Sequence, residues 1–391
     1  MENILYQYNP WWENEFIPKG IKPRDIYLNK LRKYQKDNVI ILVTGLRRVG
    51  KTSLLKLYIR NLIENDVKPQ HILYVSLDDY LLKKNTILDI VENYRRIIKI
   101  NLSEHIYLFF DEITYKEDYH QQLKNLYDHQ NITIFASASS SSLLQDKKAY
   151  LTGRSVALEI QPLFFHEYLQ FRDIHIKKSE SYLLESYFKD YMRDGGMPEN
   201  VLNPDRGYLI NLVDDIIEKD IVAFYGIKNH QKIKDYFSLL MERSGKQVSI
   251  NKIRRILEIS PDTSKRYLSY FEKTYLIHLI SRYGTTNERL LSPKKVYACD
   301  LGIKYLFIGD RDLGSYFENY VYMNIRNSRD IYYLYQNGIE VDFITSDKIL
   351  IETKYHSEMN EKQKKLFQSY PANKRLIVND IQQVEKLREI I

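Results

Sequence analysis

A glycine-rich loop between an apolar run and a helical pattern constrains this chain most. The segment GLRRVGKT, residues 45–52, directly follows VIILVT and precedes SLLKLYIRNLI. It matches the pattern G-x-x-x-x-G-K-[ST] of loops that bind nucleotide phosphates between a strand and a helix. Because Gly45 and Gly50 allow the loop to wrap, successive backbone N–H groups can point at the phosphates. The sequence therefore predicts a nucleoside triphosphate site, with ATP and Mg²⁺ as its ligands.

The side chains at the end of this loop have distinct expected roles. Lys51 would bridge β- and γ-phosphate oxygens, and the Thr52 hydroxyl would hold Mg²⁺. A chance glycine loop is the alternative, but strand, loop and helix follow one another in the required order. The residues expected to contact the nucleotide here are Gly45, Leu46, Arg47, Arg48, Val49, Gly50, Lys51, Thr52 and Ser53.

The acidic half of the site is expected at the end of another apolar strand. IYLFFDEI places Asp111 and Glu112 there. Asp111 would contact the Mg²⁺ shell, and Glu112 would orient or deprotonate the attacking water. The run ITIFASAS follows, where AAA-type ATPases have a polar residue that contacts the γ-phosphate or the water. Ser137 or Ser139 could do this, and the serine-rich stretch leaves the choice open.

The rhythm of the chain predicts an α/β fold. From about Val39 to Pro162, short apolar runs alternate with longer helical patterns, which indicates a parallel, doubly wound sheet. The expected strands are VIILVT, HILYVSL, IYLFFD, ITIFASA and VALEI, with HILYVSL placed between the loop strand and the acid strand.

Residues 163–230 change to amphipathic helical patterns and fit a lid. Residues 231–290 read as three short helices and a β-ribbon, the pattern of a winged helix-turn-helix. The expected parts are an N-terminal arm (1–20), an ATPase domain (21–165), a helical lid (166–230), a winged helix (231–290) and a further α/β domain (291–391).

Positive charge is concentrated in the expected winged helix. Residues 231–290 hold 12 Lys and Arg against 6 Asp and Glu, out of a net charge of +7 for the whole chain. This distribution suggests an anionic partner such as DNA, although solvated helix faces could give the same count. The residues expected to contact DNA are Thr263, Ser264, Lys265 and Arg266, with Tyr270 beside them and Lys252, Arg254 and Arg255 on the preceding helix.

Three charged residues near the C-terminus form a nuclease-like pattern. EVDF and ILIETKY supply Asp342, Glu352 and Lys354, and strand alternation puts the last two on one face. This D…E-x-K layout is that of the restriction-endonuclease-like superfamily. Two carboxylates could hold Mg²⁺ while the lysine activates water for phosphodiester attack. Glu318 and Gln363 are weaker candidates, and the usual proline near the Asp is absent.

Composition excludes several other classes. With 44% hydrophobic and 28% charged residues, the chain has the mix of a soluble globular protein. A single cysteine, Cys299, excludes a disulfide framework and a Cys-rich zinc site, and its apolar surroundings predict a buried core residue. The first residues lack the basic start and apolar region typical of a targeting segment, and no run approaches the ~18 apolar residues of a membrane helix. We therefore expect a cytoplasmic protein without a membrane partner.

Several motifs together resemble a known family. GLRRVGKTSLL, IYLFFDEI, LTGR, LFFHEYLQF, GGMPE, EKDI, KVYACDLG and the NPWW opening are similar to those of prokaryotic, especially archaeal, AAA+ ATPases. These join a P-loop domain to a winged helix and a C-terminal domain of the restriction-endonuclease type. The resemblance implies that Arg154 in LTGR is an arginine finger or sensor; as a finger in trans it would require a homo-oligomer. A structural arginine that caps a carboxylate is the alternative.

The expected function is therefore an ATPase that binds ATP, releases ADP and acts on DNA. A winged helix would engage the DNA, and the C-terminal domain would cut it with Asp342, Glu352 and Lys354. One alternative is a nucleotide-controlled switch whose C-terminal domain binds DNA or protein without cleavage. Another is a regulatory ATPase that uses its winged helix only as an internal joint.

Overall fold

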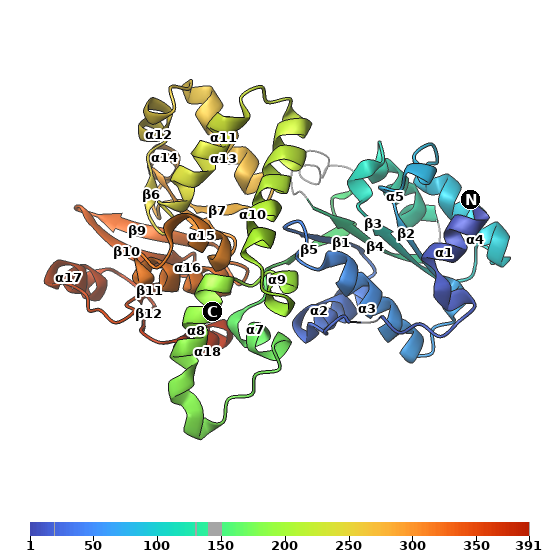
Figure 1. Cartoon of the computed structure of the whole chain (residues 1–391), viewed down its shortest axis with the longest axis horizontal. Coiled ribbons are helices and arrows are strands. Elements are labelled where there is room, and N and C mark those ends of the chain that lie inside the picture. Colours follow the sequence, from blue (N-terminus) through green and yellow to red (C-terminus); the bar gives the residue numbers. More distant parts are fainter. Residues whose placement is uncertain (19, 130, 140–150, 391) are drawn as a thin grey trace. The chain divides into compact units, whose positions relative to one another are not determined.

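The structure, a computed structural model, describes residues 1–18, 20–129, 131–139 and 151–390. It divides into two compact units, Met1–Gln161 and Pro162–Ile391. In Figure 1 the first runs from blue to teal and the second from green to red. Across the described residues, none of the helices has the length and apolarity needed to cross a membrane. The finer domain boundaries expected within the second unit remain predictions.

The first unit is a parallel sheet with helices on both faces (Figure 1). The sheet has five strands, as the alternation of apolar runs predicted. Its helices and strands are α1 Glu2–Tyr8, α2 Asp25–Lys36, β1 Ile40–Gly45, α3 Lys51–Glu64, β2 Ile72–Ser76, α4 Ile87–Ile98, β3 Ile106–Asp111, α5 Tyr119–His129, β4 Ile132–Ala138 and β5 Ser155–Ile160.

The strand order corrects one sequence expectation. The order is β2-β3-β4-β1-β5, so the strand between the loop strand β1 and the acid strand β3 is β4, and HILYVSL forms β2 at the edge. After β1 the chain crosses to β2 at one edge of the sheet. It then returns through β3 and β4 to the side of β1, and β5 lies on the other side of β1. In open parallel sheets, ligands bind beyond the carboxyl ends of the strands at such a reversal of direction. The order therefore places the phosphate loop, the acids and the end of β4 together.

The N-terminal segment covers the exposed edge of β2. The Asn9 side chain donates to the Tyr74 carbonyl at 2.9 Å and accepts from the Tyr74 N–H at 2.6 Å, as a neighbouring strand would. The indole N–H groups of Trp11 and Trp12 both donate to the Ile72 carbonyl. All three side chains are buried. Because an uncovered edge strand leaves backbone groups unpaired, the NPWW motif closes this side of the sheet.

The second unit combines helices with two small sheets. Its elements are α7 Phe165–Phe171, α8 Leu184–Asp194, α9 Pro198–Leu202, α10 Arg206–Asp215, the π-helical η7 Ile216–Ala223, α11 His230–Met241, β6 Gln247–Val248, α12 Ile250–Ile256, α13 Pro261–Lys273, β7 Ile277–Ile280, α14 Thr286–Leu291, β8 Lys294–Ala298, α15 Leu301–Ile308, α16 Leu313–Ile325, β9 Ile331–Gln336, β10 Ile339–Thr345, β11 Ile349–Thr353, α17 Glu361–Ser369, β12 Lys374–Val378 and α18 Ile381–Ile390.

The two sheets of this unit match the predicted sequence of elements. Helices α11, α12 and α13 precede an antiparallel sheet of order β6-β8-β7, as expected for three helices and a β-ribbon. Beyond it, α16, three strands, α17, β12 and α18 follow in the predicted order, and the strands form a sheet of order β12-β11-β10-β9. One hydrophobic core contains side chains from α7, α8, β8, α16, β10 and α18. Helices and strands of both sheets in this unit therefore pack into one hydrophobic core.

A buried aspartate holds two of the motifs named above against each other. Asp300 accepts hydrogen bonds from the Gly196 N–H at 2.6 Å and from the Ile303 N–H at 3.0 Å. Burial raises the pKa of Asp300 to about 6, although these backbone donors oppose the shift. The neighbouring Cys299 is buried, as predicted. Segments GGMPE and KVYACDLG thus form one structural joint.

Gly302 is required for this close approach. A Cβ atom at Gly302 would lie 2.7 Å from backbone atoms of Asp194 and Gly195. Backbone atoms cannot move aside as the end of a flexible side chain can. We expect Gly302→Ala to lower the free energy of unfolding by about 1–3 kcal/mol, because the added methyl overpacks the joint. Urea denaturation would measure it. The matched control is Gly314→Ala on α16, where a Cβ would meet nothing within 4 Å; equal destabilisation by both variants would contradict the argument.

Candidate nucleotide-binding site

The phosphate loop joins β1 to α3 with the backbone shape that its glycines allow. Gly45 has φ 136° and lies so close to the Ile160 carbonyl of β5 that a Cβ atom would collide with it. Gly50 has φ 101° and directly precedes α3, which begins at Lys51. Both φ angles lie in the region that favours glycine. The loop therefore presents the N-terminus of α3, where backbone N–H groups can bind an anion, beyond the end of β1.

Loop side chains divide into those that anchor it and those that face outward. Leu46 and Val49 are buried, so they can offer a phosphate only their backbone. Arg48 is exposed, and Arg47 is half-buried. Such a division fixes the loop to the core through Leu46 and Val49.

The first residues of α3 include the expected polar groups. Ser53, like Thr52, is half-buried. The Lys51 ammonium donates to the carbonyls of Gly45 and Leu46, each at 3.0 Å. The Lys51 side chain therefore folds back over the loop to which the phosphates would bind.

The Asp111 carboxylate accepts hydrogen bonds from hydroxyl groups on three other elements. The Thr52 hydroxyl of α3 donates to Asp111 Oδ2 at 2.5 Å, and the Tyr74 hydroxyl of β2 donates to the same oxygen at 2.8 Å. The Ser137 hydroxyl of β4 donates to Oδ1. A carboxylate next to a threonine hydroxyl is the oxygen donor set that Mg²⁺ prefers. Thr52 and Asp111 therefore fit the ion that accompanies ATP.

Tyr74 is a site residue that the sequence analysis missed. Burial, followed by the charge of Asp111, raises the pKa of Tyr74, so its hydroxyl stays protonated and donates. The signal was weak, because a tyrosine in an apolar strand resembles any other core residue. Only the pairing of β2 with β3, in which Ser76 lies opposite Asp111, brings Tyr74 to the acid.

Glu112 has a different environment from Asp111. Its backbone has φ 52° and ψ 52°, an uncommon conformation for a residue that is not glycine. Burial raises the pKa of Glu112, and the positive charge of Lys51 opposes that shift. The Ser139 hydroxyl donates to Glu112 Oε2 at 3.3 Å. A carboxylate with a raised pKa beside the phosphate loop suits proton transfer from water.

Ser137 and Ser139 occupy different places. Ser137 is fully buried and both donates to Asp111 and accepts from the Glu112 N–H at 3.0 Å, so it orients both acids. Ser139 is half-buried and bonds Glu112 itself. Ser139 is thus the better candidate for contact with the γ-phosphate or the water, and Ser137 is a positioning residue. The rest of the serine run, residues 140–142, lies outside the described residues.

Arg154 lies at the N-terminal ends of the strands, whereas the phosphate loop follows the C-terminal end of β1. Arg154 directly precedes β5, and its carbonyl accepts the N–H of Ile40 at the start of β1. The loop follows the other end of β1, which is about 17 Å away at roughly 3.3 Å per residue. Arg154 also pairs with Asp128 at 2.8 and 3.2 Å. The Asp128 pair agrees with the alternative of a structural arginine that caps a carboxylate, and a role as arginine finger or sensor stays a prediction.

The predicted DNA-contacting residues do not all reach the surface. Lys265 and Arg266 of α13 are exposed, and Thr263 is half-buried at the first turn, which Ser260 caps as predicted. Ser264 is fully buried, and its hydroxyl shares a hydrogen bond with the Tyr236 hydroxyl at 2.9 Å. The prediction that Ser264 contacts DNA is therefore wrong, because α13 packs that face against α11.

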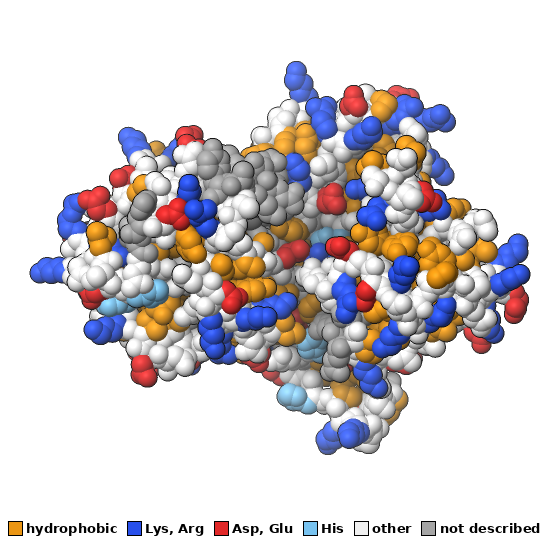
Figure 2. Space-filling model, turned by 180° about the vertical axis from the view of Figure 1, so that it is seen from behind, with side chains coloured by type: hydrophobic (Ala, Val, Ile, Leu, Met, Phe, Trp, Pro, Cys, Tyr) orange, Lys and Arg blue, Asp and Glu red, His pale blue; other side chains and the backbone are white. Residues whose placement is uncertain are grey.

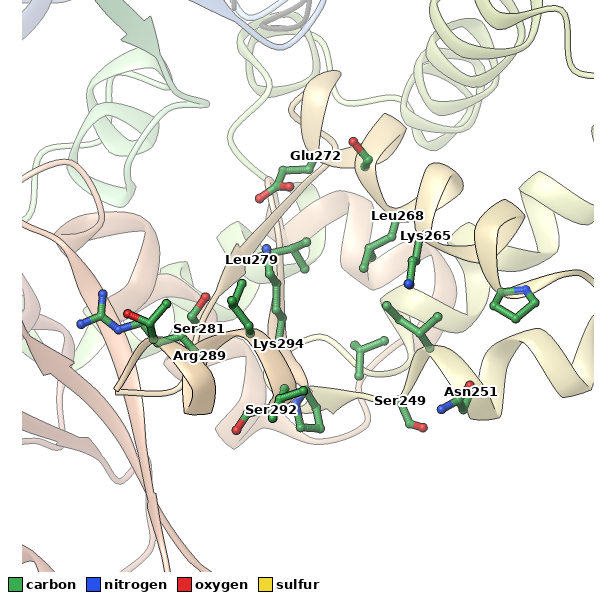
Figure 3. Close-up of a pocket in the computed structure, with 18 residues that line it drawn as sticks. Ser249, Asn251, Lys265, Leu268, Glu272, Leu279, Ser281, Arg289, Ser292 and Lys294 are labelled. Atoms are coloured by element: carbon green, nitrogen blue, oxygen red, sulfur yellow. The ribbon is translucent and has the colours of Figure 1, made fainter. Parts of the chain in front are cut away.

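A groove of about 890 Å³ lies between α13 and the strands that follow it. Figure 3 shows Lys265 and Leu268 on the α13 side, facing Leu279 of β7 and Lys294 of β8. Two exposed leucines, Leu290 and Leu291 of α14, complete its rim. On the face seen in Figure 2, basic side chains are scattered among acidic and apolar ones. The groove is thus amphipathic, and its charged lining residues are Lys265, Arg289, Lys294 and Glu272.

Asp342 and Glu352 lie next to each other on β10 and β11. Asp342 lies within β10 rather than at its end, where the register to β9 shifts between Val341 and Ile344. The Asp342 N–H donates to Glu352 Oε2 at 3.2 Å. The Lys354 ammonium contacts Glu352 Oε1 at 2.6 Å, so these two side chains share a face. Gln363 also donates to Glu352 Oε1, at 3.4 Å.

A buried lysine that the sequence analysis missed lies in the same cluster. The ammonium of Lys295, on β8, is 2.7 Å from Glu318, 2.6 Å from Glu340 and 3.5 Å from Asp342. Burial opposes its charge, but these carboxylates outweigh burial and hold the pKa of Lys295 well above its usual value. Burial, followed by the charge of Asp342, raises the pKa of Glu318 to about 7.

A Mg²⁺ ion does not fit between Asp342 and Glu352 in this arrangement. Asp342 Oδ1 faces Lys295, and Oδ2 accepts from the N–H and the hydroxyl of Thr353. Both Glu352 oxygens are paired with Lys354, Gln363 or the Asp342 N–H. Among the residues that the structure describes, no group of three or more His, Cys, Asp or Glu side chains is placed to hold a metal ion. The predicted metal ligands are therefore already occupied by the chain's own donors.

Comparisons with known proteins agree with the first of these sites. Residues 37–169 match a family described as an AAA domain. This part of the chain is an AAA-type P-loop ATPase domain. Residues 185–313 match a domain of unknown function.

Relatives that match most of this chain come from an archaeon and a bacterium. An uncharacterized protein of Methanocaldococcus jannaschii is 29% identical over 84% of this chain and 76% of its own length. An uncharacterized protein of Haemophilus influenzae is 26% identical, covering 85% of this chain and 86% of its own. A solved Walker-type ATPase of Pyrococcus abyssi covers 76% of this chain and 99% of its own, with 13% identity and a TM-score of 0.45.

Ser137→Ala tests the positioning of the two acids. Because the hydroxyl orients Asp111 and the Glu112 backbone, we expect its loss to lower kcat for ATP hydrolysis about 10- to 100-fold. ATP affinity should stay within about threefold, because the phosphate loop is untouched. Steady-state hydrolysis and fluorescent nucleotide binding would measure both. Ser76→Ala is the control, since the Ser76 hydroxyl at the end of β2 bonds Asp78; equal loss of ATP binding and turnover in Ser137→Ala would contradict the positioning role.

Proposed function

We propose that this protein binds and hydrolyses ATP and uses the reaction to act on DNA. The observation that carries the first part is the convergence of Thr52 of α3 and Asp111 of β3 beside the phosphate loop. Chemistry at this edge needs donors for phosphate oxygens, a place for the accompanying cation and a base for water. The AAA domain match supports the same conclusion.

Each residue has a role that follows from its position. Backbone N–H groups of residues 45–52 and the Lys51 ammonium bind the phosphates of ATP. Thr52 and Asp111 would hold Mg²⁺, which neutralises phosphate charge when bound. Glu112 orients the attacking water and accepts its proton, with Ser139 holding the carboxylate. ADP and inorganic phosphate are the products.

Glu112→Gln tests the proposed hydrolysis. The amide retains the shape of the side chain but cannot accept the proton of the water, so kcat should fall about 100-fold or more while ATP still binds. Phosphate release and nucleotide binding would measure the two effects. Glu117→Gln is the matched control, because Glu117 lies exposed a few residues further on. Turnover near the wild-type rate in Glu112→Gln would exclude Glu112 as the base.

The winged-helix region supports the proposed action on DNA. The exposed side chains of Lys265 and Arg266 lie on α13, the second of two helices joined by a short turn. Lys252 and Arg255 are exposed on α12. Such an arrangement suits contacts between basic side chains and the phosphates of a duplex. Homo-oligomers, with Arg154 at a neighbour's site, belong to the same proposal.

Arg266→Ala tests the DNA contact. If Arg266 pairs with a phosphate, its loss should weaken binding for all sequences and reduce the slope of log K against log salt by about 1. Fluorescence anisotropy with a labelled duplex at several salt concentrations would measure this slope. Lys228→Ala removes the same charge from an exposed position outside α11–α13. An unchanged slope in Arg266→Ala would favour a winged helix that serves as an internal joint.

One observation favours a second candidate function for the C-terminal part. The carboxylate oxygens of Asp342 and Glu352 are already paired with protein donors. This supports a nucleotide-controlled switch whose C-terminal domain binds DNA or protein without cutting it. In that case ATP turnover should proceed without Asp342-dependent cleavage of DNA.

A further inference from the structure

The N-terminal segment, residues 1–12, is joined to the nucleotide site through one residue, Tyr74 of β2. The Tyr74 N–H donates to the Asn9 side chain at 2.6 Å, and the Tyr74 carbonyl accepts from the same amide at 2.9 Å. The Tyr74 hydroxyl donates to Asp111 Oδ2 at 2.8 Å, the oxygen that also accepts from Thr52. Tyr74 therefore bonds the N-terminal segment with its backbone and the acid of the nucleotide site with its side chain.

The Asn9 amide takes the place of a neighbouring strand at this point of the sheet edge. An amide side chain offers a donor and an acceptor together, so it can pair with the N–H and the carbonyl of one residue. Its nitrogen also donates to the Leu5 carbonyl of α1 at 2.7 Å, which fixes the orientation of the amide. On its other side, Tyr74 pairs with Phe109 of β3. Because Asn9 is fully buried, losing these bonds would leave buried polar groups unpaired.

The ring of Tyr74 contacts both the N-terminal segment and the helix that follows the phosphate loop. Its centroid lies 6.0 Å from that of Tyr8, the last residue of α1. The Lys56 ammonium of α3 lies 5.6 Å from the same centroid. A shift of the N-terminal segment would therefore move the backbone and the ring that carry the hydroxyl on Asp111.

We propose that Asn9 is a positioning residue of the nucleotide site. By fixing Tyr74, it holds Asp111 Oδ2 beside Thr52 for the Mg²⁺ ion that accompanies ATP. Hydrogen bonds to the ligands of a metal ion orient those ligands, so their loss weakens binding of the ion. The N-terminal segment is then part of the ATPase and does more than cover the edge of the sheet. This inference rests on the proposed binding of ATP with Mg²⁺.

The contribution of Mg²⁺ to nucleotide binding by the full chain tests this role without hydrolysis. A fluorescent, non-hydrolysable ATP analogue is titrated with Mg²⁺ and with EDTA, and the dissociation constant in EDTA is divided by that in Mg²⁺. Asn9→Ala and Tyr74→Phe should each lower this ratio by about three- to tenfold. The double variant should match Tyr74→Phe, because Asn9 acts through Tyr74.

Trp11→Phe is the matched control for these variants. It removes another hydrogen bond between the N-terminal segment and β2, at the Ile72 carbonyl, and should keep the wild-type ratio. An unchanged ratio in Asn9→Ala would overturn the inference, and so would an Asn9→Ala effect that persists in full in the Tyr74→Phe background. A wild type that binds none of the analogue would contradict the proposed ATP site and this inference with it.

Hydrogen–deuterium exchange of the wild type tests the proposal even if Asn9→Ala does not fold. Coupling between two sites is reciprocal, so an ion whose binding depends on Asn9 must in turn stabilise the N-terminal segment. We expect the backbone amides of residues 5–12 to exchange more slowly with the analogue and Mg²⁺ than with the analogue and EDTA. Equal exchange under the two conditions would overturn the inference.

Discussion

The buried carboxylate of Asp111 is the group on which the nucleotide site depends. A charged group away from water costs free energy unless it is paired, and Asp111 is paired with hydroxyl groups of Thr52, Tyr74 and Ser137. These come from a helix and two strands on either side of β3. Their convergence follows from the strand order, which brings the carboxyl ends of β2, β3 and β4 to one edge. The acid, the loop and the sheet topology therefore support one another.

In the second unit, carboxylates are paired with lysine ammonium groups instead of hydroxyl groups. Its carboxylates at Glu318, Glu340 and Asp342 are balanced by Lys295, and Glu352 is balanced by Lys354. Hydroxyl donors around Asp111 leave its negative charge available to a cation, whereas a lysine neutralises the charge itself. This difference separates a site suited to a nucleotide's metal ion from a cluster in which the protein supplies the cation.

Local patterns predicted the helices and strands well, and they located the phosphate loop and the two acids in the chain. The loop glycines, the start of α3 at Lys51 and the acids after IYLFF each depend on residues close together in sequence, so the pattern contains the needed information. The succession of α16, three strands, α17, β12 and α18 was likewise readable from apolar periodicity. Errors arose where a role depended on distant contacts. Ser264 was expected to contact DNA, but it faces α11 and is buried there.

The sequence by itself determined that this chain has a phosphate loop with two acids and a basic, three-helix segment, because those features are encoded in short-range spacing. Tertiary structure decided which strand lies beside the acid, that Tyr74 and Ser137 orient it, and that Lys295 fills the C-terminal cluster. Lys295 and Glu340 are 45 residues apart. No spacing rule relates such residues; only the packing of β8 against β10 brings their opposite charges into contact, where burial makes the pairing obligatory.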